Sequence, residues 1–372
     1  MPRRLYPGEG GGLIGGSHMS RMHKTRIAFH WLFLVLPSLG CGGGGNATKI
    51  DTAVAPVDTR LTADTPSTKA CSMASAVGMR ACVSAARYRE DLEFVAQPRS
   101  PGSAHWQAVQ DRCAGRFAEL GYTVERQAYG TGVNVLGTRV GDSANPTVLV
   151  SAHYDHIGDC PGADDDGTGV AAVLELARVF STASYAGTLV LACWDEEERG
   201  LLGSKAYVAE LKTRGTKLTA MMGFEMLGYR SSAPYSQTMP KDFESFFPEA
   251  ASKVKANELR ADFIGLVYDQ MAASFGVRVA THASAELLPL MEIMVPAALK
   301  SSALAADLRR SDHASFWDGD VPAIMISDTA DLRNPHYHCQ GGPDVVADLD
   351  LDFAVKVVRA AAGTLAETLV VR

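Results

Sequence analysis

The strongest signal in the chain is HYDHIGDCPGADDDGTG at residues 153–169, joined by a second stretch, WDEEERGLLGS, at residues 194–204. Each stretch follows an apolar, β-branched run, TVLVSA at 147–152 and GTLVLAC at 187–193, and each precedes a helical pattern. Such runs predict buried parallel strands, and open α/β folds bind their ligands at the carboxyl ends of those strands. We therefore expect a histidine and several carboxylates to meet at one edge of a sheet.

Farther along the chain, strand and helix patterns continue to alternate. Apolar residues recur at helical spacing over 104–120, 167–180 and 353–370, and buried-strand patterns cover 219–229 and 321–329. Strands that alternate with helices indicate a sheet covered on both faces. The sequence therefore predicts an α/β fold of three layers, α/β/α, around a central sheet that is mixed but mostly parallel.

The N-terminal region has the pattern of an export signal. Basic residues precede the apolar stretch at 27–36, and PSLGC ends at Cys41. SLGC resembles a bacterial lipoprotein box, so a lipid on Cys41 is the one membrane attachment that we expect; an ordinary secretory signal is the alternative. We predict a signal segment over 1–41, a flexible linker over 42–70 and a folded domain over 71–372, in a protein exported to the cell envelope, the periplasm or the medium.

Composition narrows the class of protein. The chain has 372 residues, of which 47% are hydrophobic, and a formal net charge of -7. An acidic chain lacks the basic footprint of a nucleic-acid-binding protein, so we expect no nucleic-acid partner. The chain has seven cysteines, and an exported protein meets conditions in which disulfides persist. The sequence alone does not fix their pairing.

The first stretch has the donor groups of a metal site. His153 and Asp155 stand two residues apart at a strand end, so both side chains face the same side. One can bind a metal while the other orients it. Asp164, Asp165 and Asp166 repel one another unless a cation is close or water solvates them, and capping of the following helix explains one of them at most. Histidine and carboxylates without thiolates suit zinc.

The second stretch brings three adjacent glutamates, Glu196, Glu197 and Glu198, to the end of its strand. Adjacent glutamates can divide the work at a metal centre, because one binds the metal while the next takes a proton from metal-bound water. A solvated, acidic helix start is the alternative for this cluster taken alone. Together with the aspartate cluster, the glutamates indicate a two-metal hydrolase.

Four segments resemble the co-catalytic di-zinc aminopeptidases of peptidase clan MH, a family that also includes glutamate carboxypeptidases and glutaminyl cyclases. In chain order they are HYD at 153–155, GADDDGTG at 162–169, EERGLLGS at 197–204 and NPHYHC at 334–339. The resemblance runs from about residue 73 to the C-terminus. It implies a zinc-aminopeptidase-like catalytic domain that binds two Zn²⁺ ions.

The resemblance also implies a role for each matching residue. Five side chains are implied to bind zinc: His153, Asp165, Glu198, Glu225 and His338. Asp165 is implied to bridge the two ions. Three further residues are implied to act in catalysis: Glu197 as general base, Asp155 as the residue that orients His153, and Tyr337 as a donor to the oxyanion.

Two departures from the family pattern stand out. In FEMLG the chain has Glu225 where the family usually has an aspartate, and one more methylene can change the spacing of the ions. After His338 the chain continues CQGGPD instead of a Thr-Pro turn followed by an acidic residue. Cys160 and Cys339 both flank expected ligand segments, so we expect them to lie close together, where a disulfide would take the place of a turn hydrogen bond.

Three more histidines lie near the motifs. His156 competes with His153 as a ligand, and His336 competes with His338; motif position favours His153 and His338. We expect His313, in SDHASF, to be structural or to orient a ligand.

The expected activity is hydrolysis of N-terminal residues from peptide substrates by a zinc exopeptidase. A carboxypeptidase of the same clan is one alternative, and it would need an arginine such as Arg99, Arg230 or Arg333 to bind the terminal carboxylate. A glutaminyl-peptide cyclase-like acyltransferase is another, and it would typically use one metal. A domain that only binds a partner would be expected to have lost ligands.

The segment 230–320 has no clear periodicity, so we expect a loop-rich insertion beside the site. Tyr229, Tyr235, Met239 and Phe243 suggest an apolar pocket for a large N-terminal side chain such as leucine or phenylalanine. Packing of these side chains onto the sheet is the alternative.

Overall fold

A computed structural model describes residues 74–143 and 145–372 of the chain. The predicted boundaries at residues 41 and 70, and the predicted lipid attachment at Cys41, lie outside these residues. The described residues fall within one compact unit. Among their helices, none combines the length and the apolar character needed to cross a bilayer.

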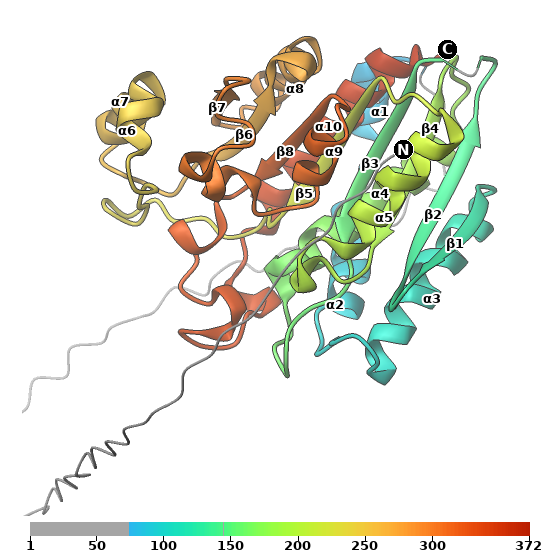
Figure 1. Cartoon of the computed structure of the whole chain (residues 1–372), viewed down its shortest axis with the longest axis horizontal. Helices are drawn as coiled ribbons and strands as arrows, with labels where there is room; N and C mark the ends of the chain where they lie inside the picture. Colours follow the sequence, from blue (N-terminus) through green and yellow to red (C-terminus); the bar gives the residue numbers. More distant parts are fainter. Residues whose placement is uncertain (1–73, 144) are drawn as a thin grey trace, which may run out of the picture. The chain divides into compact units, whose positions relative to one another are not determined.

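The described residues build an eight-stranded sheet with helices on both faces (Figure 1). From edge to edge its strands are β1 (Thr123–Tyr129), β2 (Gly132–Val140), β4 (Thr188–Trp194), β3 (Thr147–His153), β5 (Ala220–Glu225), β8 (Ala323–Ser327), β6 (Ile264–Asp269) and β7 (Leu290–Val295). The four central strands β4, β3, β5 and β8 run parallel, whereas β1, β2 and β6 pair antiparallel with neighbours. The predicted mixed sheet is confirmed.

Each face of the sheet carries its own core. Val148 and Val150 point into one core and Leu149 into the other, as the two-residue period of a strand requires. The first core is covered by α1 (Ala76–Ala81), α2 (Ala85–Val95), α3 (Ala104–Glu119), α4 (Gly169–Ser181), α8 (Ala273–Ala285) and α10 (Leu351–Leu369). The second is covered by α5 (Leu202–Arg214), α6 (Phe243–Phe246), α7 (Pro248–Ala256) and α9 (His313–Asp318).

The expectation of a loop-rich insertion over 230–320 is wrong for most of that segment. It contains β6 and β7, which extend the sheet, together with α6 to α9. Strand β6 is the apolar run IGLVYD, and all six of its residues are buried. A short apolar run between polar loops carries too little periodicity to separate a strand from a helix turn, which is why this part of the sheet was missed.

The carboxyl edge of the central strands collects the motif residues. His153 is the last residue of β3, and Glu225 is the last residue of β5. Glu197 and Glu198 follow β4, and Tyr337 and His338 lie in the connection after β8. Because these strands are parallel neighbours, all their carboxyl ends face the same side, so distant parts of the sequence meet there.

Candidate metal centre

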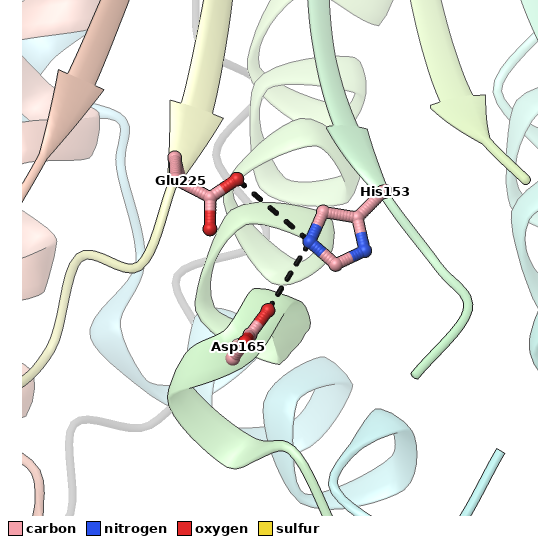
Figure 2. Close-up of side chains that lie close together, drawn as sticks. All are labelled: His153, Asp165 and Glu225. Atoms are coloured by element: carbon pink, nitrogen blue, oxygen red, sulfur yellow. Dashed lines mark ion pairs between the residues drawn. The ribbon is translucent and has the colours of Figure 1, made fainter. Parts of the chain in front are cut away.

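A first group of donors joins the ends of β3 and β5. Figure 2 shows His153, Asp165 and Glu225 converging, with Asp165 supplied by the turn Ala163–Thr168 before α4. Nε2 of His153 lies 3.2 Å from Oδ1 of Asp165 and 3.8 Å from Oε2 of Glu225. All three residues are buried.

A second group faces the other oxygen of Asp165. Nε2 of His338 lies 3.2 Å from Oδ2 of Asp165 and 3.1 Å from Oε2 of Glu198. His156 belongs to this second group, because its Nδ1 lies 2.9 Å from Oε1 of Glu198. The structure therefore brings together all five predicted ligands, with one carboxylate shared between the groups. It also shows that His156 and His153 do not compete for one position.

The donor atoms fit a pair of zinc ions. Ligand atoms about 2.0–2.1 Å from a tetrahedral zinc are about 3.3 Å apart, close to most of the distances above. Nε2 of His153, Oε2 of Glu225 and Oε1 of Glu198 are buried and have no hydrogen-bond partner among the described residues. Buried polar atoms without partners are costly, and a bound cation would satisfy these.

Asp155 connects the two groups. Its Oδ1 lies 3.5 Å from Nδ1 of His153, on the side of the ring opposite the donor nitrogen. The same carboxylate accepts the backbone N–H groups of Glu197, at 3.0 Å, and of Glu198, at 3.3 Å. The backbone carbonyl of Asp155 also lies 3.2 Å from Nδ1 of His153. One buried residue therefore faces the His153 ring and also holds the turn that carries both glutamates.

Carboxylates gather at the centre and shift the pKa values of its groups. Burial alone would lower the pKa of His153, but the carboxylates of Glu197 and Asp155 outweigh burial and raise it well above its ordinary value. Burial raises the pKa of Glu197 well above its usual range. Burial opposes ionisation of Asp165 too, yet His156 and His153 hold its pKa well below the usual value. A divalent cation would relieve this accumulation of carboxylates.

The three adjacent aspartates divide their roles. Asp166 accepts the N–H groups of Gly169, the first residue of α4, and of Met226, both at 3.1 Å. Asp164 accepts from Gly228 at 2.8 Å and from the side chain of Asn334 at 3.0 Å. Only Asp165 remains for the two donor groups.

Tyr337 lies beside the second group. Its ring stacks on that of His338, with centroids 3.8 Å apart, and its hydroxyl accepts a hydrogen bond from Arg310 at 3.0 Å. The hydroxyl hydrogen therefore remains available to a substrate oxygen. Arg310, which also pairs with Asp331 at 2.8 Å, was missed in the sequence because no motif marks it.

The three arginines considered as carboxylate binders are engaged elsewhere. Arg99 is fully buried and donates to backbone carbonyls, among them those of Gly162 and Asp165. Arg333 donates to the carbonyl of Phe263 at 2.7 Å. Arg230 pairs with Asp350 at 3.1 Å. A role of Arg99 in supporting the aspartate turn could not be predicted, because the two segments are far apart in sequence.

The remaining histidines near the motifs lie beside other groups. Nδ1 of His336 lies 3.0 Å from Oδ2 of Asp348. Nε2 of His313 lies 2.9 Å from the carbonyl of Leu308. Neither histidine belongs to the two donor groups.

A disulfide links two loops that flank the second group. Cys160 and Cys339 are bonded, so the loop after β3 is tied to the segment that carries His338. The expected closeness of these two cysteines is confirmed. Cys193 is a buried free thiol.

An apolar cavity opens beside the donor groups. Glu225, Arg310 and Tyr337 are among the residues that line it. The rest of its wall is largely apolar and includes Met239, Phe243, Phe263, Val267, Ile293 and Met325. Two of the four predicted pocket residues, Met239 and Phe243, are therefore in place, whereas Tyr235 is 78% exposed and Tyr229 is not part of the wall.

Residues 134–267 match the sequence pattern of peptidase family M28, over a stretch that holds four of the five predicted ligands. The chain resembles this family over that stretch. It is 32% identical over 215 residues to the uncharacterized protein YfbL of Escherichia coli, covering 54% of this chain and 61% of that protein. It is 27% identical over 248 residues to a probable leucine aminopeptidase of Trichophyton verrucosum, covering 63% of this chain and 56% of the relative. The chain thus spans about three fifths of the length of these relatives.

The fold is also that of solved aminopeptidases. The structure of the LapA aminopeptidase of Legionella pneumophila superposes with a TM-score of 0.60, over 79% of this chain and 74% of LapA, at 17% identity. At this identity the likeness concerns the fold. The predicted three-layer, zinc-aminopeptidase-like architecture is therefore confirmed.

Proposed function

We propose that the chain is a zinc-dependent aminopeptidase that uses two ions to hydrolyse N-terminal residues from peptides. The observation that carries the proposal is the position of Asp165, which presents one oxygen to His153 and the other to His338. Two cations that share a carboxylate can act together on one attacking water and one carbonyl. The match of residues 134–267 to peptidase family M28 supports the same reaction class.

The side chains around the donor groups have matching roles. Bound zinc would supply Lewis acidity and lower the pKa of a coordinated water toward ~7. Glu197, held in place through its backbone by Asp155, is positioned to accept the proton of the attacking water and pass it to the leaving amine. Tyr337 directs its hydroxyl hydrogen to the developing oxyanion, because Arg310 already occupies a lone pair of the hydroxyl.

The cavity supports a substrate with a large apolar first residue. Glu225 of the first donor group and Tyr337 line it, and Met239 and Phe243 contribute to its apolar wall. Arg310 lines the cavity as well, but its charge is balanced by Asp331. An acidic centre with a neutralised arginine favours a free amino group over a free carboxylate, and hence an aminopeptidase over a carboxypeptidase.

A panel of aminoacyl-anilides tests the proposal with the zinc-loaded protein. Leucyl and phenylalanyl anilides should be cleaved fastest, and acetylation of their amino groups should abolish cleavage. Phe243→Ala should lower kcat/KM for these substrates and leave kcat/KM for alanyl-anilide little changed. The substitution removes a part of the cavity wall that only large substrate side chains reach. Tyr235→Ala is the matched control, since that ring is largely exposed. Cleavage of N-acetylated substrates would refute the aminopeptidase assignment.

We also propose that the protein is exported and anchored by a lipid on Cys41. The proposal rests on the charged segment, apolar stretch and SLGC sequence that end at this residue. Mass spectrometry of protein from the native host should find an acylated cysteine as the mature N-terminus. An unmodified terminus at another residue would refute the anchor.

A further inference from the structure

His156 lies in the second donor group, but it is neither one of the five predicted ligands nor part of the proposed mechanism. It lies three residues beyond the end of β3 and is fully buried. Neither of its ring nitrogens makes a hydrogen bond to another described residue. A buried imidazole with two unsatisfied nitrogens is expensive, so its burial needs a partner that the protein alone does not supply.

A carboxylate oxygen close to His156 also lacks a hydrogen-bond partner. Oε1 of Glu198 lies 2.9 Å from Nδ1 of His156, and both atoms are buried without a hydrogen bond of normal geometry. Oε2 of Glu198 is the oxygen that faces His338, at 3.1 Å. The two oxygens of Glu198 are therefore divided between two histidines.

The first donor group shows the same signature. Nε2 of His153 and Oε2 of Glu225 are close, buried and without hydrogen bonds. Two ligands of one tetrahedral ion approach each other in this way, because the nitrogen lone pair points at the ion and not at the neighbouring oxygen. The pair formed by His156 and Glu198 thus fits two ligands of one ion, because Asp165 lies close to both. His336 and Asp348 also approach each other without a hydrogen bond, but they have no third donor among the described residues.

We propose that His156 is a sixth zinc ligand, which binds the second ion through Nδ1. This inference rests on the proposed two-zinc function. The second ion would then have four protein ligands: His156, Asp165, Glu198 and His338. The first would have three, namely His153, Asp165 and Glu225. Four protein ligands close a zinc site, whereas three leave a position for water or substrate, so the two ions differ in role. The second ion is the more tightly held, and the first is the one that exchanges its ligand.

Spectroscopy of the metal-substituted protein counts the imidazoles directly. In protein loaded with two Co²⁺ ions, proton NMR shows a strongly shifted N–H signal for each bound imidazole that keeps its other nitrogen protonated. Three such signals are expected, from His153, His156 and His338. Zinc X-ray absorption on the native holoprotein should likewise require three imidazoles for two ions.

Two variants assign the third signal. His156→Gln should remove one shifted signal and weaken binding of the second ion by more than about 100-fold in chelator competition, since loss of an outer partner alone costs about 10–100-fold. His336→Gln is the matched control, because His336 pairs with Asp348 outside both groups, and it should keep all signals and both affinities.

The outcomes separate the ligand role of His156 from the two-zinc function. Only two shifted imidazole signals in a wild-type protein that holds two ions would overturn the ligand role of His156 and leave the aminopeptidase proposal standing. Three signals that persist in His156→Gln would overturn it as well. A wild-type protein that binds fewer than two ions would overturn the two-zinc function itself.

Discussion

At the scale of single residues, three adjacent glutamates face three different surroundings. Glu196 pairs with Arg199 at 2.7 Å, and Glu198 lies in the second donor group. Glu197 has its backbone fixed by Asp155 but keeps its carboxylate free for chemistry, in a setting where burial raises its pKa. A base held near a metal site and made more basic by burial suits proton transfer at neutral pH.

Glu197→Gln should lower kcat by about 10²–10⁴-fold, because it removes the proton acceptor and preserves size and hydrogen bonding. Zinc content, measured by mass spectrometry of the metal, should stay at two ions per chain. Glu196→Gln serves as the control and should keep most activity. Activity of Glu197→Gln within a few-fold of the wild type would exclude the general-base role.

His313 links stability to pH. Burial lowers its pKa to about 4, from about 6.5 in an unfolded chain. Between these values the unfolded chain binds more protons than the folded one, so the stabilisation is present above pH 6.5 and is lost as the pH falls toward 4. His313→Gln should therefore lose about 2 kcal/mol less of its unfolding free energy than the wild type between pH 7 and pH 4.5. Urea denaturation at the two pH values measures this, and equal losses would contradict it.

At the scale of elements, strand ends were predictable and distant supports were not. The runs before His153 and Glu197 are apolar and directly precede charged motifs, so their placement at the sheet edge follows from the sequence alone. Asp344 accepts the N–H group of Asp164 at 2.9 Å across 180 residues of sequence. No local sequence pattern predicts such a contact, because the two segments are far apart in the sequence. The same holds for the contact between Arg310 and Tyr337.

The disulfide between Cys160 and Cys339 joins two loops that each carry a donor of the second group. It closes a loop of 179 residues, which the chain-entropy model equates with about 5 kcal/mol of stability. Cys160→Ser should therefore lower the thermal midpoint and weaken binding of the second ion, as should reduction of the wild type. Chelator competition and calorimetry measure both effects, under non-reducing conditions for the variant and with and without reductant for the wild type. Cys193→Ala, which alters a thiol in the core, should leave metal affinity unchanged; an equal loss there would show that the disulfide has no special connection to the site.

At the scale of the whole molecule, the donor groups lie where the chain's distant parts meet. Their residues follow β3, β4, β5 and β8, and they span the sequence from His153 to His338. Without a cation, the carboxylates gathered there repel one another, and the free energy that their burial costs is offset by the rest of the fold. Bound ions would cross-link four strand ends at this edge of the sheet.

Removal of zinc should therefore destabilise the entire domain and not only inactivate it. One ion present at about 1,000 times its dissociation constant contributes about 4 kcal/mol to folding, which corresponds to roughly 10 °C in thermal midpoint. Scanning calorimetry before and after chelation should show a loss of at least this size in a single transition, restored by Zn²⁺ and not by Mg²⁺, which prefers six oxygen ligands and fits poorly between histidines. An unchanged midpoint after complete metal removal would mean that the strand ends are held together without ions, and that the buried atoms lacking hydrogen bonds are satisfied by water instead.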